Sequence, residues 1–586
     1  MSGSKTNNNI ENIRHSLAHL LAMAVRAYDP EVKFGIGPVI DNGFYYDFEF
    51  SPEKTPSPEA LKQLQKEIKK YIAQNLSFEQ KFISEKDARQ LFSEQLYKLE
   101  LIDELVKVGE KISVYTCGDF TDLCSGPHIA STKEIKNDAF ALVRLAGAYW
   151  RGSEENAMLT RIYGYAFKTK EELDAFLTLQ EEAKKRDHRK LGKELDLFTF
   201  SELVGGGLPL WTPKGTILRE ELDSFVWELR KAKGYQKVSI PHITKKDLYE
   251  TSGHWSKFAE ELFRIKTREG HEFAMKPMNC PHHTQIFAHL PRSYKDMPQR
   301  YAETTMVYRD EQSGELSGLS RVRCITQDDA HVFCRENQIK GEIFLIWDII
   351  DTFYSTFGFE LKVRLSLHDP NNFDAYLGTK EIWKNSENML RELAKERGAE
   401  YFEAQGEAAM YGPKVDFITK DSLGREWQVA TIQLDRNMPE RFDLFCINEK
   451  GEKERAIMIH AAIMGSIERF SSVLIEHLAG NFPTWLSPVQ VAVLAVGADQ
   501  NSYAEKIHTT LKEKDIRVEF PETNETLGYR IREAEKQKIP YILVVGKKEE
   551  EQQTVSIRKR GQKDGGVLSI DEFITNIAEE IRTRKA

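Results

Sequence analysis

Two long strand candidates joined by a short loop constrain the fold of this chain more than any other feature. Residues 301–311 have the pattern of a strand, residues 312–319 are rich in Gly and Ser, and residues 321–334 have the pattern of a returning strand. Further apolar or alternating segments lie between residues 195 and 483. This region is therefore predicted to contain a large antiparallel sheet.

The returning strand carries polar residues at alternate positions. Because side chains alternate along a strand, Gln327, Asp329 and His331 project to one face, and Asp328, Ala330 and Val332 to the other. Three polar side chains on one face of an otherwise apolar sheet indicate a substrate pocket. Taken alone, a solvent-exposed strand face explains them equally well.

The composition is that of an ordinary globular protein. The 586 residues suggest about four domains at roughly 150 residues each, and mean hydropathy is −0.50. No apolar run reaches the roughly 18 residues of a membrane-spanning helix. Six scattered cysteines without a C-x-x-C pair do not indicate a disulfide scaffold. We expect a cytoplasmic protein with no membrane partner, and the net charge of −9 argues against indiscriminate nucleic-acid binding.

The first 166 residues have mixed helix and strand signals. A polar tail at 2–9, expected to be loose, precedes a helical pattern at 15–28. A strand-like stretch at 44–50 and an amphipathic helix at 58–74 follow. These signals predict one α+β domain.

A linker helix is predicted next. Thr169 and Glu172 have the spacing of a capping box, which marks the start of a helix. The helix turns strongly basic at 184–190, and for that run alone a solvated helix face is at least as good an explanation as a linker. Three glycines at 205–207 and Pro209 mark a loop into the next domain.

The last hundred residues alternate regularly between strand and helix patterns. The strands are predicted at 489–496, 517–520 and 541–545 and the helices at 502–514 and 529–538. This alternation predicts an α/β domain with a parallel sheet.

A thiol and several imidazoles recur in the first domain. His15 and His19 are four residues apart on one predicted helix face, and Cys124 and His128 lie on a Gly-Pro turn. They indicate a pocket that activates water for hydrolysis, although surface histidines and a buried thiol remain an alternative. Tyr46, Lys98 and Asp122 could add a cation and hydrogen bonds, or could be plain surface residues.

A second group of metal-type ligands lies in the sheet region. One thiol, Cys280, and two imidazoles, His331 and His460, suit zinc and leave a fourth position open. Their separations along the chain do not by themselves identify them as a set.

Basic residues near a helix start suggest an anion site. The segment 465–470 begins a helix whose N-terminal N–H groups favour an anion. Arg309, Arg321 and Arg469 could together neutralise a triphosphate, whereas each alone is more often a surface ion-pair partner.

Seven segments in the same order resemble the threonyl-tRNA synthetases, which are class II aminoacyl-tRNA synthetases. They read RHSLAH at 14–19, YTCGDFTDLCSGPH at 115–128, KPMNCP at 276–281, YRDE at 308–311, QDDAHVFC at 327–334, GSIERF at 465–470 and LVVG at 543–546. The three class II motifs map onto 216–241, 300–334 and 465–470. The resemblance implies an editing domain at 1–166, a helical linker at 167–194, a class II catalytic domain with an antiparallel sheet at 195–483 and an α/β anticodon-binding domain at 484–586.

By this resemblance, Arg309 holds the ATP α-phosphate, Glu311 the adenine side, and Arg321 and Arg469 the outer phosphates, with Mg²⁺ accompanying ATP. One zinc per subunit is held by Cys280, His331 and His460 and binds the threonine amino and hydroxyl groups, while Asp329 accepts a hydrogen bond from that hydroxyl. The remaining residues implied for the amino-acid and adenylate pocket are Gln327, Tyr411, Lys414, Gln428, Thr431, Gln433 and Ser466.

The resemblance also implies a function for each of the two groups of cysteine and histidine residues. An apolar pocket separates valine from threonine by only about 10²-fold, whereas a site that requires the hydroxyl rejects the analogue without it by roughly 10⁴ to 10⁵. Serine keeps the hydroxyl and lacks one methyl group, a difference of about 1 to 3 kcal/mol. Mischarged seryl-tRNA must therefore be hydrolysed, and this is the role implied for His15, His19, Tyr46, Lys98, Asp122, Cys124 and His128. Metal in that pocket is not predicted.

The implied partners are tRNA(Thr), L-threonine and ATP, and the implied assembly is a homodimer. In the anticodon domain, Asn524, Glu549 and Arg558 are predicted to contact bases, because polar loops can hydrogen-bond splayed-out bases. Two features depart from the family. The ubiquitin-like domain that many members carry is expected to be absent, and His282 follows Pro281 where glycine is common.

Three alternative functions remain from the residues alone. A synthetase for another amino acid is disfavoured by the implied zinc ligands. An RNA-binding regulator without chemistry is disfavoured by the intact arginines and zinc ligands. A stand-alone metallohydrolase would have no use for the ATP apparatus.

Overall fold

The computed structural model describes residues 4–521, 524–562 and 565–584, and the chain divides into two compact units, Met1–Glu181 and Glu182–Ala586. The division falls within helix α5 (Lys170–Arg186). Thr169 Oγ1 accepts a hydrogen bond from Glu172 N at 3.2 Å, and the Glu172 carboxylate accepts one from Thr169 N at 3.3 Å. The predicted capping box therefore starts this helix.

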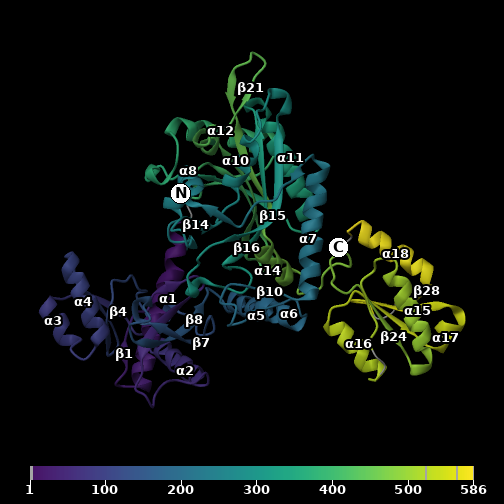
Figure 1. Cartoon of the computed structure of the whole chain (residues 1–586). Coiled ribbons are helices and arrows are strands. Elements are labelled where there is room, and N and C mark those ends of the chain that lie inside the picture. The colour runs from purple at the N-terminus through teal and green to yellow at the C-terminus, as the bar shows by residue number, and fades with distance from the viewer. Residues whose placement is uncertain (1–3, 522–523, 563–564, 585–586) are drawn as a thin grey trace. The chain divides into compact units, whose positions relative to one another are not determined.

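The first unit is built around helix α1 (Ser4–Tyr28), which packs against helix α2 (Ala60–Ala73) and strand β3 (Gly43–Glu49) (Figure 1). Leu17, Leu20, Leu21 and Val25 are fully buried, as their helical spacing predicts. The expectation of a loose tail at 2–9 is wrong from Ser4 onward, because α1 begins there. Extending a helix that is already nucleated costs little even for polar residues.

Two antiparallel sheets complete this unit. The larger has the order β1-β3-β8-β7, with β2 paired to β3, and the smaller has the order β4-β5-β6. The strands are β1 (Lys33–Phe34), β2 (Val39–Ile40), β7 (Phe140–Tyr149), β8 (Met158–Ala166), β4 (Phe78–Phe82), β5 (Ser113–Cys117) and β6 (Phe120–Leu123). Helices α3 (Glu85–Leu91) and α4 (Leu96–Val108) lie between β4 and β5 in the chain. The predicted α+β character is confirmed.

An eight-stranded sheet forms the centre of the second unit, with the order β11-β15-β16-β23-β20-β19-β17-β18. The strands are β11 (Gln236–Lys237), β15 (Gln299–Tyr308), β16 (Cys324–Cys334), β23 (Ile457–Ser466), β20 (Glu426–Asp435), β19 (Lys414–Lys420), β17 (Leu361–Leu367) and β18 (Tyr401–Gln405). Every pair inside the sheet is antiparallel, and only the two edge pairs are parallel. The large antiparallel sheet is thus confirmed, with β15 and β16 as its predicted long pair.

Helices that pack on one face of this sheet include α7 (Pro213–Ala232), α11 (Ile339–Ser355), α12 (Lys380–Glu396) and α14 (Ile467–His477). The apolar residues Ala330 and Val332 of β16 pack into the core beneath them. The period of two then turns Gln327, Asp329 and His331 to the opposite face of the sheet. The predicted division of this strand into two faces is confirmed.

The C-terminal part of the second unit contains a five-stranded sheet with the order β25-β24-β26-β27-β28. Its strands are β25 (Val518–Glu519), β24 (Val491–Ala495), β26 (Tyr541–Val545), β27 (Thr554–Lys559) and β28 (Val567–Ser569). Helices α15 (Asn501–Lys512) and α18 (Ile570–Arg582) pack on one face and α16 (Leu527–Lys536) on the other. The first three strands are parallel as predicted, whereas β27 and β28 are antiparallel, because short connections reverse the chain direction.

No helix within the described ranges of the chain has both the length and the apolar character required to cross a lipid bilayer.

Candidate functional site

A cavity of about 700 Å³ opens on the face of the eight-stranded sheet opposite helices α7, α11 and α14. Every residue that the sequence analysis assigned to chemistry in this region lines it: Cys280, Arg309, Glu311, Arg321, Gln327, Asp329, His331, Tyr411, Lys414, Gln428, Thr431, Gln433, His460, Ser466 and Arg469.

Strand register explains why residues so far apart in the chain meet. His331 on β16 pairs directly with His460 on β23, His460 with Gln433 on β20, and Gln433 with Lys414 on β19. Directly paired residues on one face have neighbouring side chains. The sheet therefore presents a continuous row of nitrogen-bearing side chains to the cavity.

One end of that row is a three-ligand group, which consists of Cys280, His331 and His460. Their ligand atoms all lie within 4.8 Å of one another, and all three residues are buried. Cys280 is the first residue of helix α10 (Cys280–Ala288), and His331 Nε2 lies 3.0 Å from His460 Nδ1. One thiol and two imidazoles at this spacing match the donor set of a zinc site with an open position.

The nitrogens that face away from the three-ligand group are held by neighbours. His331 Nδ1 lies 2.7 Å from Nδ1 of His283, and His460 Nε2 lies 2.9 Å from the carboxylate of Asp435. Partners of this kind orient imidazoles for metal binding. Sequence reasoning missed both, although Asp435 follows Gln433 at the strand period of two.

Burial disfavours the charged forms of Cys280 and His331. It raises the pKa of the Cys280 thiol well above its ordinary value and lowers the pKa of His331 well below its ordinary value. Asp329 lies beside the group, and its carboxylate accepts a hydrogen bond from Asn279 Nδ2 at 3.0 Å. His282, which stands where the family commonly has glycine, is buried. Its Nε2 lies 2.6 Å from Thr244 Oγ1, and the residue does not line the cavity.

Arginines line another part of the cavity. Arg309 donates to the Met278 sulfur at 3.4 Å, and its buried Nε has no hydrogen-bond partner among the described atoms. Burial, with the nearby charge of Arg321, lowers the pKa of Arg469. The nearest carboxylate to Arg309 Nε is that of Glu261, at 4.0 Å. Neighbouring guanidinium groups that repel one another suit a polyanion.

Glu311 lines the cavity and pairs with one of its arginines. Its carboxylate accepts a hydrogen bond from Arg321 Nε at 2.8 Å, and Glu315 binds the same guanidinium at 2.8 Å. Ser466 caps helix α14 by accepting from Arg469 N at 3.1 Å. The cap therefore places Arg469 on the first turn of this helix.

Asp416 organises the polar floor of the cavity, and sequence reasoning missed it. This fully buried carboxylate accepts hydrogen bonds from Gln428 at 2.9 Å, from Thr431 at 2.6 Å and from Arg364 at 3.0 Å. Lys414 lies 3.3 Å away. The alternation from Lys414 to Asp416 along β19 was a usable signal.

The remaining predicted residues of the cavity have varied partners. Gln433 donates to Gly412 O at 3.0 Å, and the buried Oε1 of Gln327 has no partner within the described part of the chain. The ring of Tyr411 lies 4.8 Å from that of His460.

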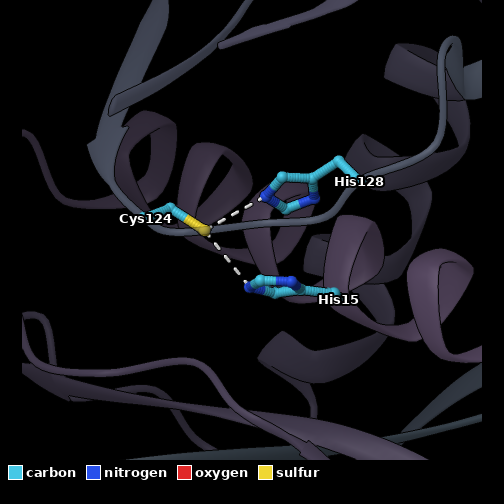
Figure 2. A group of neighbouring side chains, drawn as sticks. All are labelled: His15, Cys124 and His128. Carbon is cyan, nitrogen blue, oxygen red and sulfur yellow. Dashed lines mark hydrogen bonds between the residues drawn. The ribbon is translucent and has the colours of Figure 1, made fainter. Parts of the chain in front are cut away.

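The first unit contains a thiol–imidazole cluster, which consists of His15, Cys124 and His128 (Figure 2). Cys124 Sγ lies 3.3 Å from Nε2 of each imidazole. Nδ1 of His15 lies 3.2 Å from Pro127 O, and Nδ1 of His128 lies 3.0 Å from Ser16 Oγ. The structure thus joins the helix residue His15 to the Gly-Pro turn.

The other predicted residues of this pocket form a second, fully buried group. Asp122 accepts a hydrogen bond from Tyr46 OH and pairs with Lys98 Nζ at 2.7 Å. His19 stands apart from the thiol–imidazole cluster: its ring lies 5.1 Å from that of His128, and its Nε2 has no described partner. His15 therefore lies against His128, and not against His19 on its own helix.

Electrostatics keep the thiol–imidazole cluster neutral. Burial raises the pKa of Cys124 to about 11 and lowers that of His128 to about 2. Burial also lowers the pKa of His15, partly opposed by its bond to Pro127. At neutral pH the cluster thus contains a protonated thiol and two uncharged imidazoles.

The three residues predicted to contact an anticodon lie on separate elements. Glu549 caps helix α17 (Lys547–Gln552) by accepting from Gly546 N at 2.9 Å, and Arg558 lies on β27. Asn524 adjoins residues 522–523, which are outside the described part of the chain.

Three known families match this chain. The tRNA synthetase class II core domain (G, H, P, S and T) matches residues 263–478, and the anticodon binding domain matches residues 490–580. The threonyl and alanyl tRNA synthetase second additional domain matches residues 112–163. These matches cover the large cavity, the C-terminal sheet and part of the first unit.

Similar proteins span almost the whole chain. A threonine–tRNA ligase of Porphyromonas gingivalis is 48% identical over 572 residues, which are 97% of this chain and 87% of that protein. A threonine–tRNA ligase of Carboxydothermus hydrogenoformans is 47% identical over 98% of this chain and 89% of its own length.

Solved structures agree. The RNA binding domain of threonyl-tRNA synthetase from Cryptosporidium parvum Iowa II has a TM-score of 0.65 and 36% identity, and the match covers 67% of this chain and 98% of that one. A prolyl-tRNA synthetase from Giardia lamblia, at 17% identity and a TM-score of 0.55, shares the fold. From its identity to these relatives over nearly its full length, the chain belongs to the threonyl-tRNA synthetase family.

Proposed function

We propose that this chain uses ATP to join L-threonine to tRNA(Thr) through threonyl-adenylate and hydrolyses seryl-tRNA(Thr) formed in error. One observation carries the proposal: the three-ligand group and the arginines Arg309, Arg321 and Arg469 line a single cavity. An amino acid held at one end and a triphosphate at the other would meet within it. The family to which the chain belongs supports both substrates.

Zinc is the ion that fits the three-ligand group, because Cys280, His331 and His460 supply one soft and two borderline donors with orienting partners behind the imidazoles. When bound, zinc would supply a positive centre for the amino and hydroxyl groups of threonine. Asp329, beside the group, would accept a hydrogen bond from that hydroxyl. A substrate without the hydroxyl would leave this carboxylate unpaired.

The activation step rests on position and charge. The threonine carboxylate attacks the α-phosphorus of ATP in line, and the bond to the leaving pyrophosphate breaks. Arg309 would stabilise the charge on the α-phosphate, and Arg321 and Arg469 the charge on the outer phosphates, together with Mg²⁺. The buried Nε of Arg309 has no hydrogen-bond partner among the described atoms and only a long ion pair with Glu261, at 4.0 Å, and this supports the role.

Hydrolysis of seryl-tRNA would use the thiol–imidazole cluster. The Nδ1–H groups of His15 and His128 donate to Pro127 and Ser16, so both Nε2 atoms are acceptors. The thiol has one proton and can satisfy only one of them. The other Nε2 would accept a proton from a water molecule as its oxygen attacks the seryl ester, releasing serine and the tRNA hydroxyl.

The remaining parts of the proposal are the anticodon contacts of Asn524, Glu549 and Arg558, a homodimer and a cytoplasmic location. They follow from the family resemblance, as do the domain limits at residues 166, 194 and 483.

The test combines metal analysis with threonine-dependent pyrophosphate exchange. Wild-type protein is expected to contain about one zinc per chain, to exchange with threonine and to reject valine by about 10⁴-fold. Cys280→Ala is expected to lose both the zinc and the exchange, whereas the control Cys324→Ala keeps both. A zinc-free wild type, or one that activates valine as well as threonine, would refute the proposal.

A further inference from the structure

One histidine of the basic linker run is buried. His188 is only 4% exposed, although its neighbours Arg189 and Lys190 are exposed. It is the first residue of helix α6 (His188–Glu194), and Asp187 caps that helix by accepting from Arg189 N at 2.8 Å. The solvated helix face that explains the rest of the run does not explain this residue.

Both ring nitrogens of His188 have defined partners. Nδ1 lies 2.7 Å from the carboxylate of Glu476 on α14, which also accepts from the His188 backbone N at 3.0 Å. An ionised carboxylate only accepts hydrogen bonds, so Nδ1 carries the proton and Nε2 is free to accept. Nε2 accepts from the backbone N–H of Leu319 at 3.1 Å.

Leu319 belongs to the loop that joins β15 and β16. It is fully buried, and the next two residues, Ser320 and Arg321, line the large cavity. Ser320 Oγ lies 2.9 Å from Ser472 Oγ on α14. The buried end of this loop is thus held by His188 and α14 immediately before the residues that face the cavity.

The loop touches the imidazole so closely that only glycine fits beside it. Gly318 has a φ of +49°, and a Cβ built there would lie 2.2 Å from His188 Nε2. The ring therefore acts as a fixed stop for the backbone at 318–319.

Asp187, His188 and Glu476 are close enough to be considered a metal site. Each already has a protein partner, because Arg189 pairs with Asp187, and Arg425 and His188 pair with Glu476. Ion pairing within the protein accounts for the cluster.

We infer that His188 is a positioning residue for ATP: it holds the β15–β16 loop so that Ser320 and Arg321 face the nucleotide. The inference rests on the proposed function of the cavity. His188 lies two residues after Arg186, the last residue of α5, which bonds to His477 O at 3.1 Å. The end of the linker helix and the nucleotide loop are thereby attached to the same helix, α14.

The test measures pyrophosphate exchange by the full chain, with ATP and threonine varied separately. His188→Asn keeps a donor for Glu476 but has no acceptor that reaches Leu319, whereas the amide oxygen of His188→Gln can replace Nε2. We expect His188→Asn to raise the KM for ATP about fivefold, because that is the effect of losing one hydrogen bond. The KM for threonine should not change. His188→Gln should restore the KM for ATP, and the exposed-histidine control His271→Ala should leave it unchanged.

A double-mutant cycle between Gly318 and His188 tests the same contact independently. Gly318→Ala alone should raise the KM for ATP, because its methyl group displaces the loop from the imidazole. In a His188→Ala background the clash with the ring is gone, whereas the strain of alanine at a φ of +49° and the approach to Arg189 Cγ at 2.9 Å remain. Gly318→Ala should therefore raise the KM for ATP by a smaller factor in that background than in the wild type. Additive effects, or equal KM values for His188→Asn and His188→Gln, would overturn the inference. A wild type without threonine-dependent exchange would instead refute the proposed function on which it rests.

Discussion

Single hydrogen bonds outside the thiol–imidazole cluster define the chemistry available inside it. Pro127 O and Ser16 Oγ each take the Nδ1–H of one imidazole, which leaves both Nε2 atoms as bases directed at Cys124. Ser16 can accept because its own proton goes to Asn12 O at 2.8 Å. The protonation pattern of the site is therefore set by backbone carbonyls and one hydroxyl.

The pH dependence of seryl-tRNA hydrolysis follows from this arrangement. The base is a neutral imidazole, and burial lowers the pKa of His15, so the enzymatic rate should be constant from about pH 7 to 8.5 and fall only well below pH 6.5. The Cys124 thiol, with a pKa of about 11, should add nothing in that range. Initial rates with and without enzyme test this, since the ester also hydrolyses spontaneously. A tenfold rise per pH unit above pH 7 would instead identify the thiolate as the base.

Strand β16 serves two purposes at the scale of a secondary-structure element. One face carries Gln327, Asp329 and His331 into the cavity, and the other carries the fully buried Asp328. Burial raises the pKa of Asp328 to about 6. The charge of Arg230 on α7 and the hydrogen bonds that Asp328 accepts from two backbone N–H groups of β23 oppose this rise. This carboxylate ties a covering helix and a neighbouring strand to the strand that positions the site.

Removing that carboxylate should destabilise the second unit. Asp328→Ala leaves Arg230 buried without its ion-pair partner and should cost about 3 to 5 kcal/mol in the free energy of unfolding. Asp328→Asn, which keeps one acceptor oxygen, should cost less, and the exposed control Asp374→Ala almost nothing. Urea unfolding followed by tryptophan fluorescence measures the differences. An Asp328→Ala variant as stable as wild type would contradict the role of this ion pair.

At the scale of the whole molecule, synthesis and hydrolysis are assigned to different compact units. The thiol–imidazole cluster belongs to Met1–Glu181, and the large cavity to Glu182–Ala586. Each site is complete within its own unit. Substitutions in the two sites should therefore act independently.

This independence predicts a double dissociation. Arg309→Ala should lower pyrophosphate exchange by about 10²-fold or more and leave seryl-tRNA hydrolysis unchanged. His15→Ala should lower that hydrolysis by roughly 10² to 10⁴ and leave exchange unchanged. The exposed control Arg268→Ala should change neither. Loss of both activities in either single variant would show that the sites do not act separately.

The fold and the site were predictable to different extents. The β15–β16 pair and the capping box at Thr169 follow from local patterns, because each depends on neighbours in the chain. The parallel strands β24 and β26 follow from the alternation of strand and helix patterns along this domain. The antiparallel direction of β27 and β28 was not predicted, because it results from the short connections between these strands. Asp416 and Asp435 each lie two residues after a predicted site residue on the same strand, so their position on the cavity face could have been predicted. His283 had no such pattern.

What the sequence determined by itself is the inventory: which strands form, which faces are polar and which residue types could bind zinc, phosphate or water. Only the tertiary structure decided which of them meet. His331 and His460 pair because β16 and β23 adopt one register, and His15 joins His128 rather than His19 because a turn folds back onto its helix. Local periodicity acts over a few residues, whereas register and packing are fixed by burying a whole face at once.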